Sequence, residues 1–440
     1  MKKLIEFLIS KIKFIILIYL FVQVIIILSS NIDYRSDSLY YFNLAQQSIE
    51  RGDTYPAQIH LYEDYLVAPL YINSLIIILK IYNSTSTIAF FNLIIILLQI
   101  LILYKLTSKI FSINAAVLAT ILYLFYINTI GLMLQNYTEL FFLLLISSSI
   151  YFITGKKKLD LIFAGIIMGA AIAVRPLGWA LLFSVLLLQI LSSIKFKKLL
   201  TDYFYFYFGT ILFVLVFGGL VFLQVGKFEY TSTTGPVNLL IGANDDATGG
   251  FNALVHERGK TGFIENADSL TYIQKGEFYQ NQAINWITEN PIKWIALAPL
   301  KLFHTYGWDD ISISNMLGFE STNFARILRV IISNGDLNQE LPHTSITVKI
   351  VYFVILIIAH LYYYLLLMSI LAGVYFYLKY QTRISTTSII LLFCLFATLM
   401  IMITVGTPRY KYPMFVLLLP FAAYYLTNKF KIGVISAKQN

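Results

Sequence analysis

Long apolar runs separated by short polar stretches dominate the chain. Clear examples are the segments 14–28, 140–153, 211–223 and 350–378. A transmembrane β-strand reads as about ten residues of alternating polarity, whereas a helix needs about 20 apolar residues to cross about 30 Å of hydrocarbon. The unbroken runs therefore predict membrane-spanning helices rather than a barrel.

The composition supports this interpretation. Of the 440 residues, 58% are hydrophobic and 12% are charged, and the mean hydropathy is +0.74. A soluble domain carries about 25% charged residues, so this chain has too little charge to cover a soluble particle of its size. The apolar content also excludes disorder, and the single cysteine, Cys394, excludes a disulfide scaffold. A polytopic membrane protein is what remains.

The runs predict an all-α fold with ten spans. Lys2, Lys3, Lys11 and Lys13 precede the first run, which is longer than a usual signal core and lacks a small-residue cleavage site. We therefore expect this run to be retained and to enter from the cytoplasm. The last long run is either one tilted helix or two helices broken near Ala372–Gly373. The expected spans are 14–30, 86–104, 111–132, 140–154, 159–174, 177–194, 203–224, 349–378, 386–406 and 411–428.

One further apolar stretch, 65–82, decides the topology. It carries Pro69 and Asn73. If it does not cross the membrane, seventeen of the 32 basic residues fall on the cytoplasmic side and six fall in short outer segments. If it crosses, the clusters Lys156–Lys158 and Lys195–Lys198 face outward, against the preference for positive charge inside. We therefore predict that 65–82 lies along the outer membrane surface and that both termini are cytoplasmic.

This topology divides the chain into three parts. Residues 1–224 form an N-terminal transmembrane module whose first outer loop is 31–85, residues 225–348 form a large extracytoplasmic loop region, and residues 349–440 form the C-terminal helices. Within the loop region we expect an amphipathic helix at 272–288 and an interfacial stretch at 294–303. The net charge of +9 reflects basic clusters at the inner membrane face, so nucleic acid is not expected as a partner.

Two carboxylates lie at expected helix starts on the outer side. Asp37 falls in a first turn with Ser36 as N-cap, and Tyr41 follows one turn later on the same face. Glu139 opens the fourth span. A carboxylate at a helix N-terminus is stabilised electrostatically, which is a sufficient structural explanation for each acid alone. Either acid is also a candidate to take a proton from an attacking hydroxyl.

Two arginines lie between apolar runs on the same side. Arg175 precedes Pro176, and Arg409 stands between Pro408 and Tyr410. Each could snorkel to lipid head groups. Their outer location opposes the usual charge bias, however, and this favours binding of an anion such as phosphate. Acids and arginines together suit a reaction in which a lipid-borne phosphate leaves as a hydroxyl attacks, although spacing alone does not show that they converge.

The remaining motifs are weak. Asn244-Asp245-Asp246 with Gly249-Gly250 lacks the spacing and terminal glutamate of an EF-hand. The scattered histidines have no metal-ligand spacing. No metal ligands are predicted, and dependence on a divalent cation is left open.

The order of these motifs resembles the GT-C superfamily of membrane glycosyltransferases, particularly bacterial relatives of protein O-mannosyltransferases and of the aminoarabinose transferases that modify lipid A. The stretches 238–250 and 283–291 are similar to segments common in bacterial members. The other similar motifs are Asp37 to Ala45 with Gly52 in the first outer loop, Thr138-Glu139 in the second, Val174-Arg175-Pro176 in mid-chain, and Arg409-Tyr410-Lys411-Tyr412-Pro413 before the last span.

The resemblance implies a GT-C-like bundle of about 10 (10–12) transmembrane helices with juxtamembrane helices in the first outer loop. It also implies an inverting hexosyl- or pentosyltransferase. Such an enzyme moves a sugar from a polyprenyl-phosphate carrier to a lipid, glycan or protein hydroxyl on the outer face of the bacterial cytoplasmic membrane.

The same resemblance assigns roles to individual residues. Asp37 would be the general base and Glu139 a second acidic residue. The phosphate and substrate contacts would be Arg175, Arg409, Tyr41, Tyr410 and Lys411. Two departures from the family pattern leave the base open, because the first loop holds a second candidate, Asp33, and Glu139 replaces an aspartate of the aminoarabinose-type enzymes.

Two other functions are compatible with a polytopic chain. An envelope oligosaccharide polymerase or ligase would rely on outer-loop arginines or a histidine such as His256. A flippase or transporter would need charged or broken helices near the bilayer midplane. Transport is the weaker alternative, because the expected spans hold no central carboxylate and their polar residues are mainly Gln23, Gln99, Gln189, Gln224 and His360.

Overall fold

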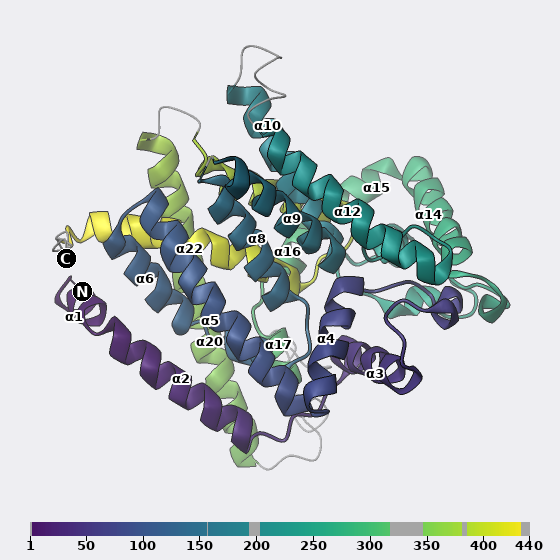
Figure 1. The fold of residues 1–440 in the computed structure, drawn as a ribbon, viewed down its shortest axis with the longest axis horizontal. Coiled ribbons are helices and arrows are strands. Elements are labelled where there is room, and N and C mark those ends of the chain that lie inside the picture. Colours follow the sequence, from purple (N-terminus) through teal and green to yellow (C-terminus); the bar gives the residue numbers. More distant parts are fainter. Residues whose placement is uncertain (1, 156, 193–202, 317–345, 381–384, 433–440) are drawn as a thin grey trace.

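All regular secondary structure in the described parts of the chain is helical (Figure 1). The computed structural model describes residues 2–155, 157–192, 203–316, 346–380 and 385–432. Within these ranges no strand forms, and the β contact present is an isolated bridge between Gly250 and Gly406. The predicted all-α class is confirmed for the described residues. The basic residues Lys156, Lys195, Lys197, Lys198, Arg383 and Lys438, and the loop segment 317–345, lie outside them.

The N-terminal part of the chain, up to residue 225, contains most of the described helices. In chain order they are α1 (Lys2–Ser10), α2 (Ile12–Ser29), α3 (Ser36–Arg51), η1 (Gln58–Tyr62), α4 (Pro69–Ile81), α5 (Thr85–Ile110), α6 (Ile113–Leu124), α7 (Asn128–Leu134), α8 (Glu139–Ile153), α9 (Lys158–Val174), η2 (Pro176–Gly178), α10 (Trp179–Ser192) and α12 (Phe204–Val225).

Shorter elements make up the loop region, and three long helices end the chain. The loop elements are α13 (Gly235–Ile241), η3 (Ala253–His256), η4 (Ala267–Ser269), α14 (Tyr272–Glu289), α15 (Pro291–Ala296), α16 (Ala298–Tyr306) and α17 (Ile311–Met316). The C-terminal elements are α20 (Ile346–Tyr380), α21 (Ser388–Ile403), η5 (Pro408–Lys411) and α22 (Tyr412–Lys429).

Each expected span coincides with a helix, or in one case with two helices. By length and composition, four described helices are able to cross a membrane: α2, α5, α12 and the 349–380 part of α20. A fifth candidate arises if α6 and α7 count as one span. The apolar helices α4, α8, α10 and α21 are shorter. The total of ten spans, and the surface position of 65–82, therefore stay predictions.

The segment 111–132 differs from the expected single helix. It forms α6 and α7, which meet at an angle of 61°. At this break, the Tyr126 hydroxyl and the Asn128 amide both donate hydrogen bonds to Asp309 Oδ1, at 2.9 and 3.1 Å. The polar contacts with the loop region thus occur where the helix changes direction.

The last long run forms one continuous helix, α20, and the alternative of a break near Ala372–Gly373 is wrong. Gly373 instead permits close packing of α20 on α22, because a Cβ there would overlap the carbonyl oxygen of Phe421. Glycine at a helix crossing lets two backbones approach closely. The same device operates between α9 and α12, where a Cβ on Gly165 would overlap the Phe206 carbonyl oxygen.

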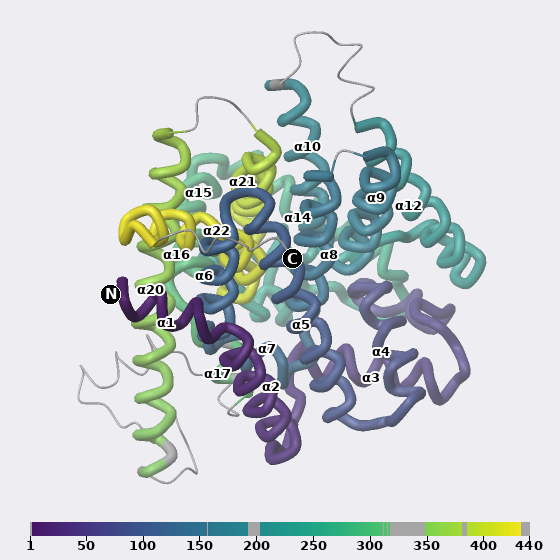
Figure 2. The backbone as a smooth tube through the Cα atoms, turned by 60° about the vertical axis from the view of Figure 1, so that its left-hand side comes forward, coloured from purple at the N-terminus to yellow at the C-terminus, as the bar shows by residue number. Residues whose placement is uncertain are grey.

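Helix packing brings the first loop, residues 31–85, to the ends of the central helices. Helix α9 packs between α8 and α12, and α4 packs against α3, α5 and α9 (Figures 1 and 2). In the loop region, α14 coincides with the expected amphipathic helix. The expected interfacial stretch falls in α15 and α16, where Ile295 and Leu300 are exposed, and its position at the membrane interface stays a prediction.

Candidate active site

Four helix ends carry the two acids and two arginines singled out in the sequence. Asp37 lies in the first turn of α3 and Glu139 is the first residue of α8. Arg175 directly follows α9, and Arg409 lies in the short helix η5 that leads into α22. All four side chains line one cavity of about 950 Å³. The tertiary structure thus brings together residues that are up to 372 positions apart.

Alternating charges connect the four side chains. Glu139 Oε1 lies 2.7 Å from Arg175 Nη1 and 3.8 Å from Arg409 Nε. Arg409 Nη2 donates to Asp37 Oδ2 in an ion pair. The order is Asp37, Arg409, Glu139, Arg175, so every charge has an opposite neighbour. Such an arrangement lets two guanidinium groups stay buried beside the cavity.

The two carboxylates differ strongly in exposure. The Asp37 side chain is 43% exposed, whereas that of Glu139 is 2% exposed. Among the described residues, no group hydrogen-bonds the buried Oε2 of Glu139. Asp37 is therefore the acid that a molecule in the cavity reaches directly, and Glu139 mainly serves the two arginines.

Aromatic rings support both guanidinium groups. Arg409 Cζ lies 4.4 Å from the ring centre of Tyr137, and Arg175 Cζ lies 4.8 Å from that of Tyr410. Stacking on an aromatic face stabilises a cation and restricts its motion. Burial alone would lower the pKa of Arg409, but Asp37 and Glu139 more than offset this and raise that pKa well above its ordinary value. Arg409 is thus a fixed cation.

Tyrosine hydroxyls add hydrogen-bonding groups to the cavity wall. Burial, with a further contribution from Asp37, raises the pKa of Tyr41 well above its ordinary value. Burial and then Asp37 raise the pKa of Tyr65 to about 12. Both hydroxyls keep their protons at neutral pH and are able to donate hydrogen bonds.

Backbone contacts position the turn that carries Arg409. Gly406 N–H donates to Gly249 O at 2.9 Å, which ties the turn to the loop region. A Cβ on Gly406 would overlap the carbonyl oxygen of Lys301 in α16. Glycine is required for this close approach of two backbones. Pro408 then begins η5, where its fixed φ suits a first helical position.

Two candidates from the sequence lie outside this cavity. Asp33 pairs with Arg35 at 3.3 Å and lines a separate, mainly apolar cavity of about 540 Å³. Lys411 was expected to contact phosphate, yet its side chain is fully buried and its Nζ lies 2.9 Å from Asp309 Oδ1. The reason is that η5 presents Arg409 and Tyr410 to the cavity while Lys411 lies behind them. The remaining candidates, Asp37, Tyr41, Glu139, Arg175, Arg409 and Tyr410, all line the cavity.

The structure adds residues that the sequence did not single out. Tyr137 lies two positions before Glu139, so the acidic motif itself pointed to it. Trp308, Asp310 and His304 reach the cavity from the loop region. Their sequence context carries no recognisable signal, because their position depends on how the loop region folds over the helix ends.

The charges of the site do not suit a divalent cation. Among the residues that the structure describes, no group of three or more His, Cys, Asp or Glu side chains is arranged to hold a metal ion. A cation placed between Asp37 and Glu139 would also meet the guanidinium groups that already neutralise them. The cluster suits an anionic ligand better.

Comparison with known proteins gives one family match and several structural neighbours. Residues 67–222, which include Glu139 and Arg175, match the family described as dolichyl-phosphate-mannose-protein mannosyltransferase. Among curated proteins, the sequence comparison found no significant match.

The structural neighbours are forms of the oligosaccharyltransferase of Archaeoglobus fulgidus. The apo form has a TM-score of 0.49 at 13% identity, and the complex of AglB with an inhibitory peptide and a dolichol-phosphate has 0.49 at 15% identity. Both alignments cover 96% of this chain and 50% of the neighbour. The chain thus spans about half the length of these proteins. Through the match over residues 67–222, the predicted resemblance is confirmed: the chain is similar to the GT-C membrane glycosyltransferases of the dolichyl-phosphate-mannose-protein mannosyltransferase family.

Proposed function

We propose that the protein is an inverting glycosyltransferase that moves a sugar from a polyprenyl-phosphate carrier to a hydroxyl acceptor. The observation that carries this proposal is the single cavity lined by an accessible carboxylate, Asp37, and two arginines, Arg175 and Arg409. The match to a family named for a lipid-phosphate sugar supports the type of donor. The bias of positive charge predicted from the sequence supports action at the outer face of the cytoplasmic membrane.

The reaction requires one base and one group that accepts negative charge. The acceptor oxygen attacks the anomeric carbon from the side opposite the carrier, which inverts that centre. Asp37 takes the proton of the acceptor hydroxyl. The bond between the anomeric carbon and the phosphate oxygen breaks, and the oxygen keeps the electron pair. Arg175 and Arg409 stabilise the negative charge that develops on the leaving phosphate.

The ion pair between Arg409 and Asp37 connects donor binding to base activation. The Asp37 carboxylate is paired with the Arg409 guanidinium. A carrier phosphate would compete for the same guanidinium, because phosphate is a strong bidentate partner of arginine. Donor binding would thus release Asp37 to accept a proton. Glu139, which is buried against Arg175 at 2.7 Å, would keep both arginines in place.

A donor assay with a matched control tests the proposal. Purified protein in nanodiscs receives radiolabelled polyprenyl-phosphate mannose, polyprenyl-phosphate glucose or polyprenyl-phosphate aminoarabinose, together with native membrane extract as the source of acceptor. Release of polyprenyl phosphate is then measured. We expect one donor to be consumed and Asp37→Asn to reduce its turnover by about 10²–10⁴-fold. Asp33→Asn is the control, because Asp33 lies in the same loop but outside the cavity. Equal turnover of Asp37→Asn and the unsubstituted protein would reject Asp37 as the base.

A polymerase or ligase is the alternative that this assay also addresses. His256 lines the same cavity, with its ring centre 5.2 Å from that of Tyr279. In that alternative, His256→Ala would abolish turnover and Asp37→Asn would not. We expect the opposite order, because Asp37, and not His256, is in direct contact with a cavity arginine.

A further inference from the structure

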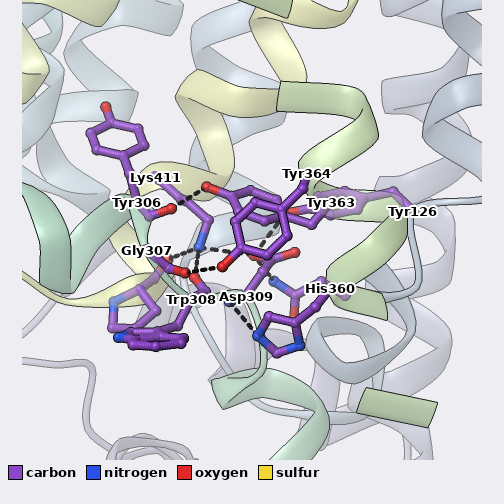
Figure 3. A network of polar contacts seen from close by, with 11 residues as sticks. Tyr126, Tyr306, Gly307, Trp308, Asp309, His360, Tyr363, Tyr364 and Lys411 are labelled. Atoms are coloured by element: carbon purple, nitrogen blue, oxygen red, sulfur yellow. Dashed lines mark hydrogen bonds and ion pairs between the residues drawn. The ribbon is translucent and has the colours of Figure 1, made fainter. Parts of the chain in front are cut away.

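A second charged cluster lies directly behind the cavity wall. Its centre is the ion pair between Lys411 Nζ and Asp309 Oδ1, at 2.9 Å, with both side chains almost completely buried (Figure 3). The two residues come from distant parts of the chain: Lys411 ends η5, and Asp309 lies between α16 and α17 of the loop region. The function proposed above uses neither residue.

The Lys411 ammonium has all its hydrogen-bonding capacity occupied. Besides Asp309, it donates to the carbonyl oxygen of Trp308 and, at 3.2 Å, to that of Pro408. The ring centre of Tyr363 lies 4.9 Å from Nζ. An ammonium has three hydrogens to donate, and these three acceptors account for them. Lys411 therefore has no donor left for a ligand in the cavity.

Asp309 also has several hydrogen-bonding partners besides Lys411. Tyr126 and Asn128, at the bend between α6 and α7, donate to its Oδ1. The Asp309 backbone N–H donates to His360 Nε2 at 3.5 Å, while His360 Nδ1 contacts the Leu356 carbonyl oxygen at 2.8 Å. Through these contacts, Asp309 connects the bend at 125–127 and the long helix α20 to Lys411 at the end of η5.

Helix α20 also fixes the residues before Asp309. The Tyr363 hydroxyl donates to the Tyr306 carbonyl oxygen at 2.6 Å, and the Tyr364 hydroxyl donates to that of Gly307 at 2.7 Å (Figure 3). The backbone from 306 to 309 is therefore attached at successive residues. Trp308 and Asp310, on either side of Asp309, both line the cavity.

The two partners are thus placed next to residues of the candidate site. Arg409 and Tyr410 immediately precede Lys411 and line the cavity, as Trp308 and Asp310 do beside Asp309. A displacement of either partner moves a segment of the cavity wall. Buried ion pairs contribute little net stability, and one recognised use is to fix a unique arrangement.

We propose that Lys411 and Asp309 are positioning residues that hold the Pro408–Lys411 turn against the 306–310 segment and so direct Arg409 and Trp308 into the cavity. They act through these neighbours and do not contact the phosphate. This inference rests on the proposed function only for what Arg409 binds. The arrangement of the wall itself is testable without any transfer reaction.

The test is a double-mutant cycle with three readouts. The variants are Asp309→Asn, Lys411→Gln and the double variant, in which both side chains keep hydrogen-bonding groups but lose their charges. The readouts are Tm, Trp308 emission after subtraction of the spectrum of Trp308→Phe, and the Kd for polyprenyl phosphate. Asp246→Asn is the matched control, because Asp246 also pairs with a lysine, Lys260, at 2.9 Å, but both side chains are exposed and neither lines the cavity.

The positioning role predicts a specific pattern. Each single variant leaves a buried charge without its partner, so we expect a lower Tm, a shifted Trp308 emission and a Kd raised about tenfold. In the double variant, the Tm, the Trp308 emission and the Kd should return most of the way to the values of the unsubstituted protein. Asp246→Asn should change none of these three quantities. A double variant that binds as weakly as Lys411→Gln, with Asp309→Asn unaffected, would mean that Lys411 itself holds the phosphate.

Two other outcomes are also decisive. Single variants with a lower Tm but unchanged Trp308 emission would show that the pair is only structural, and this would overturn the proposal. If the unsubstituted protein neither binds polyprenyl phosphate nor transfers sugar, the proposed function fails. In that case, the Trp308 emission of the unsubstituted protein, the two single variants and the double variant still decides whether the ion pair positions the cavity wall.

Discussion

The different burial of Asp37 and Glu139 leads to a prediction that separates catalysis from stability. Glu139 is 2% exposed and lies 2.7 Å from Arg175 and 3.8 Å from Arg409. The substitution Glu139→Gln would leave these two buried guanidinium groups with Asp37 as the remaining acid of the cluster. Breaking a buried ion pair by removing one partner costs about 3–5 kcal/mol.

The corresponding substitution of Asp37 should have little effect on stability. Its side chain is 43% exposed, so water screens the carboxylate side of the pair, and the more buried Arg409 (16% exposed) keeps Glu139 as a partner. A pair in which water reaches the carboxylate contributes about 1 kcal/mol. Asp37→Asn should therefore lower turnover by about 10²–10⁴-fold while leaving the free energy of unfolding nearly unchanged.

The magnitudes convert into a measurable difference in Tm. With an unfolding entropy of about 2.1 cal/mol/K per residue, a chain of 440 residues changes its Tm by about 1 °C per kcal/mol. Glu139→Gln should thus lower Tm by about 3–5 °C, and Asp37→Asn by no more than about 1 °C.

The single cysteine of the chain is a natural probe of thermal unfolding. This residue, Cys394, lies in α21 and is partly buried in the folded protein, so its reactivity toward a thiol dye rises on unfolding. A thiol-reactive fluorogenic dye therefore reports unfolding during a temperature ramp in detergent. If Glu139→Gln unfolds at the temperature of the unsubstituted protein, or if Asp37→Asn is destabilised as strongly as Glu139→Gln, the assignment of the two carboxylates is refuted.

Three further predictions concern the arginine, the backbone and the pH. Arg175→Lys keeps the charge but loses the planar group that stacks on Tyr410 at 4.8 Å, so the Kd for polyprenyl phosphate should rise about tenfold; an unchanged Kd in a binding titration would argue against a phosphate contact. Gly242→Ala should lower Tm or prevent folding, because its Cβ would overlap the Thr404 carbonyl oxygen, whereas Gly219→Ala, with open space around its Cβ, should be tolerated. Burial lowers the pKa of His60 below 6.5, so the unfolded state binds the proton more readily and stability should fall as the pH drops below about 6.5; the decrease in Tm between about pH 7.5 and pH 5 should be smaller in His60→Gln, and an equal decrease would contradict this explanation.

The class of the fold and the positions of its main helices follow from the amino-acid sequence alone. Apolar runs such as 203–224 are long enough to fix a helix without knowledge of its neighbours, and α12 follows this run closely. Hydrophobicity and helix length are local properties, so the pattern predicts them well. The order of the acidic and arginine motifs also indicated the family that residues 67–222 match.

The arrangement of side chains around the cavity depends on contacts between distant parts of the folded chain. Asp37 and Arg409 were candidates from the sequence, but their ion pair depends on the packing of α3, α8, α9 and η5. Lys411 shows most clearly what the sequence could not predict. It directly follows Arg409 and Tyr410, yet it pairs with Asp309 behind the cavity wall. The direction in which a short turn presents successive side chains is set by its contacts with distant segments, such as the hydrogen bond from Gly406 to Gly249. Local sequence does not contain those contacts, because they form only when the loop region folds over the helix ends.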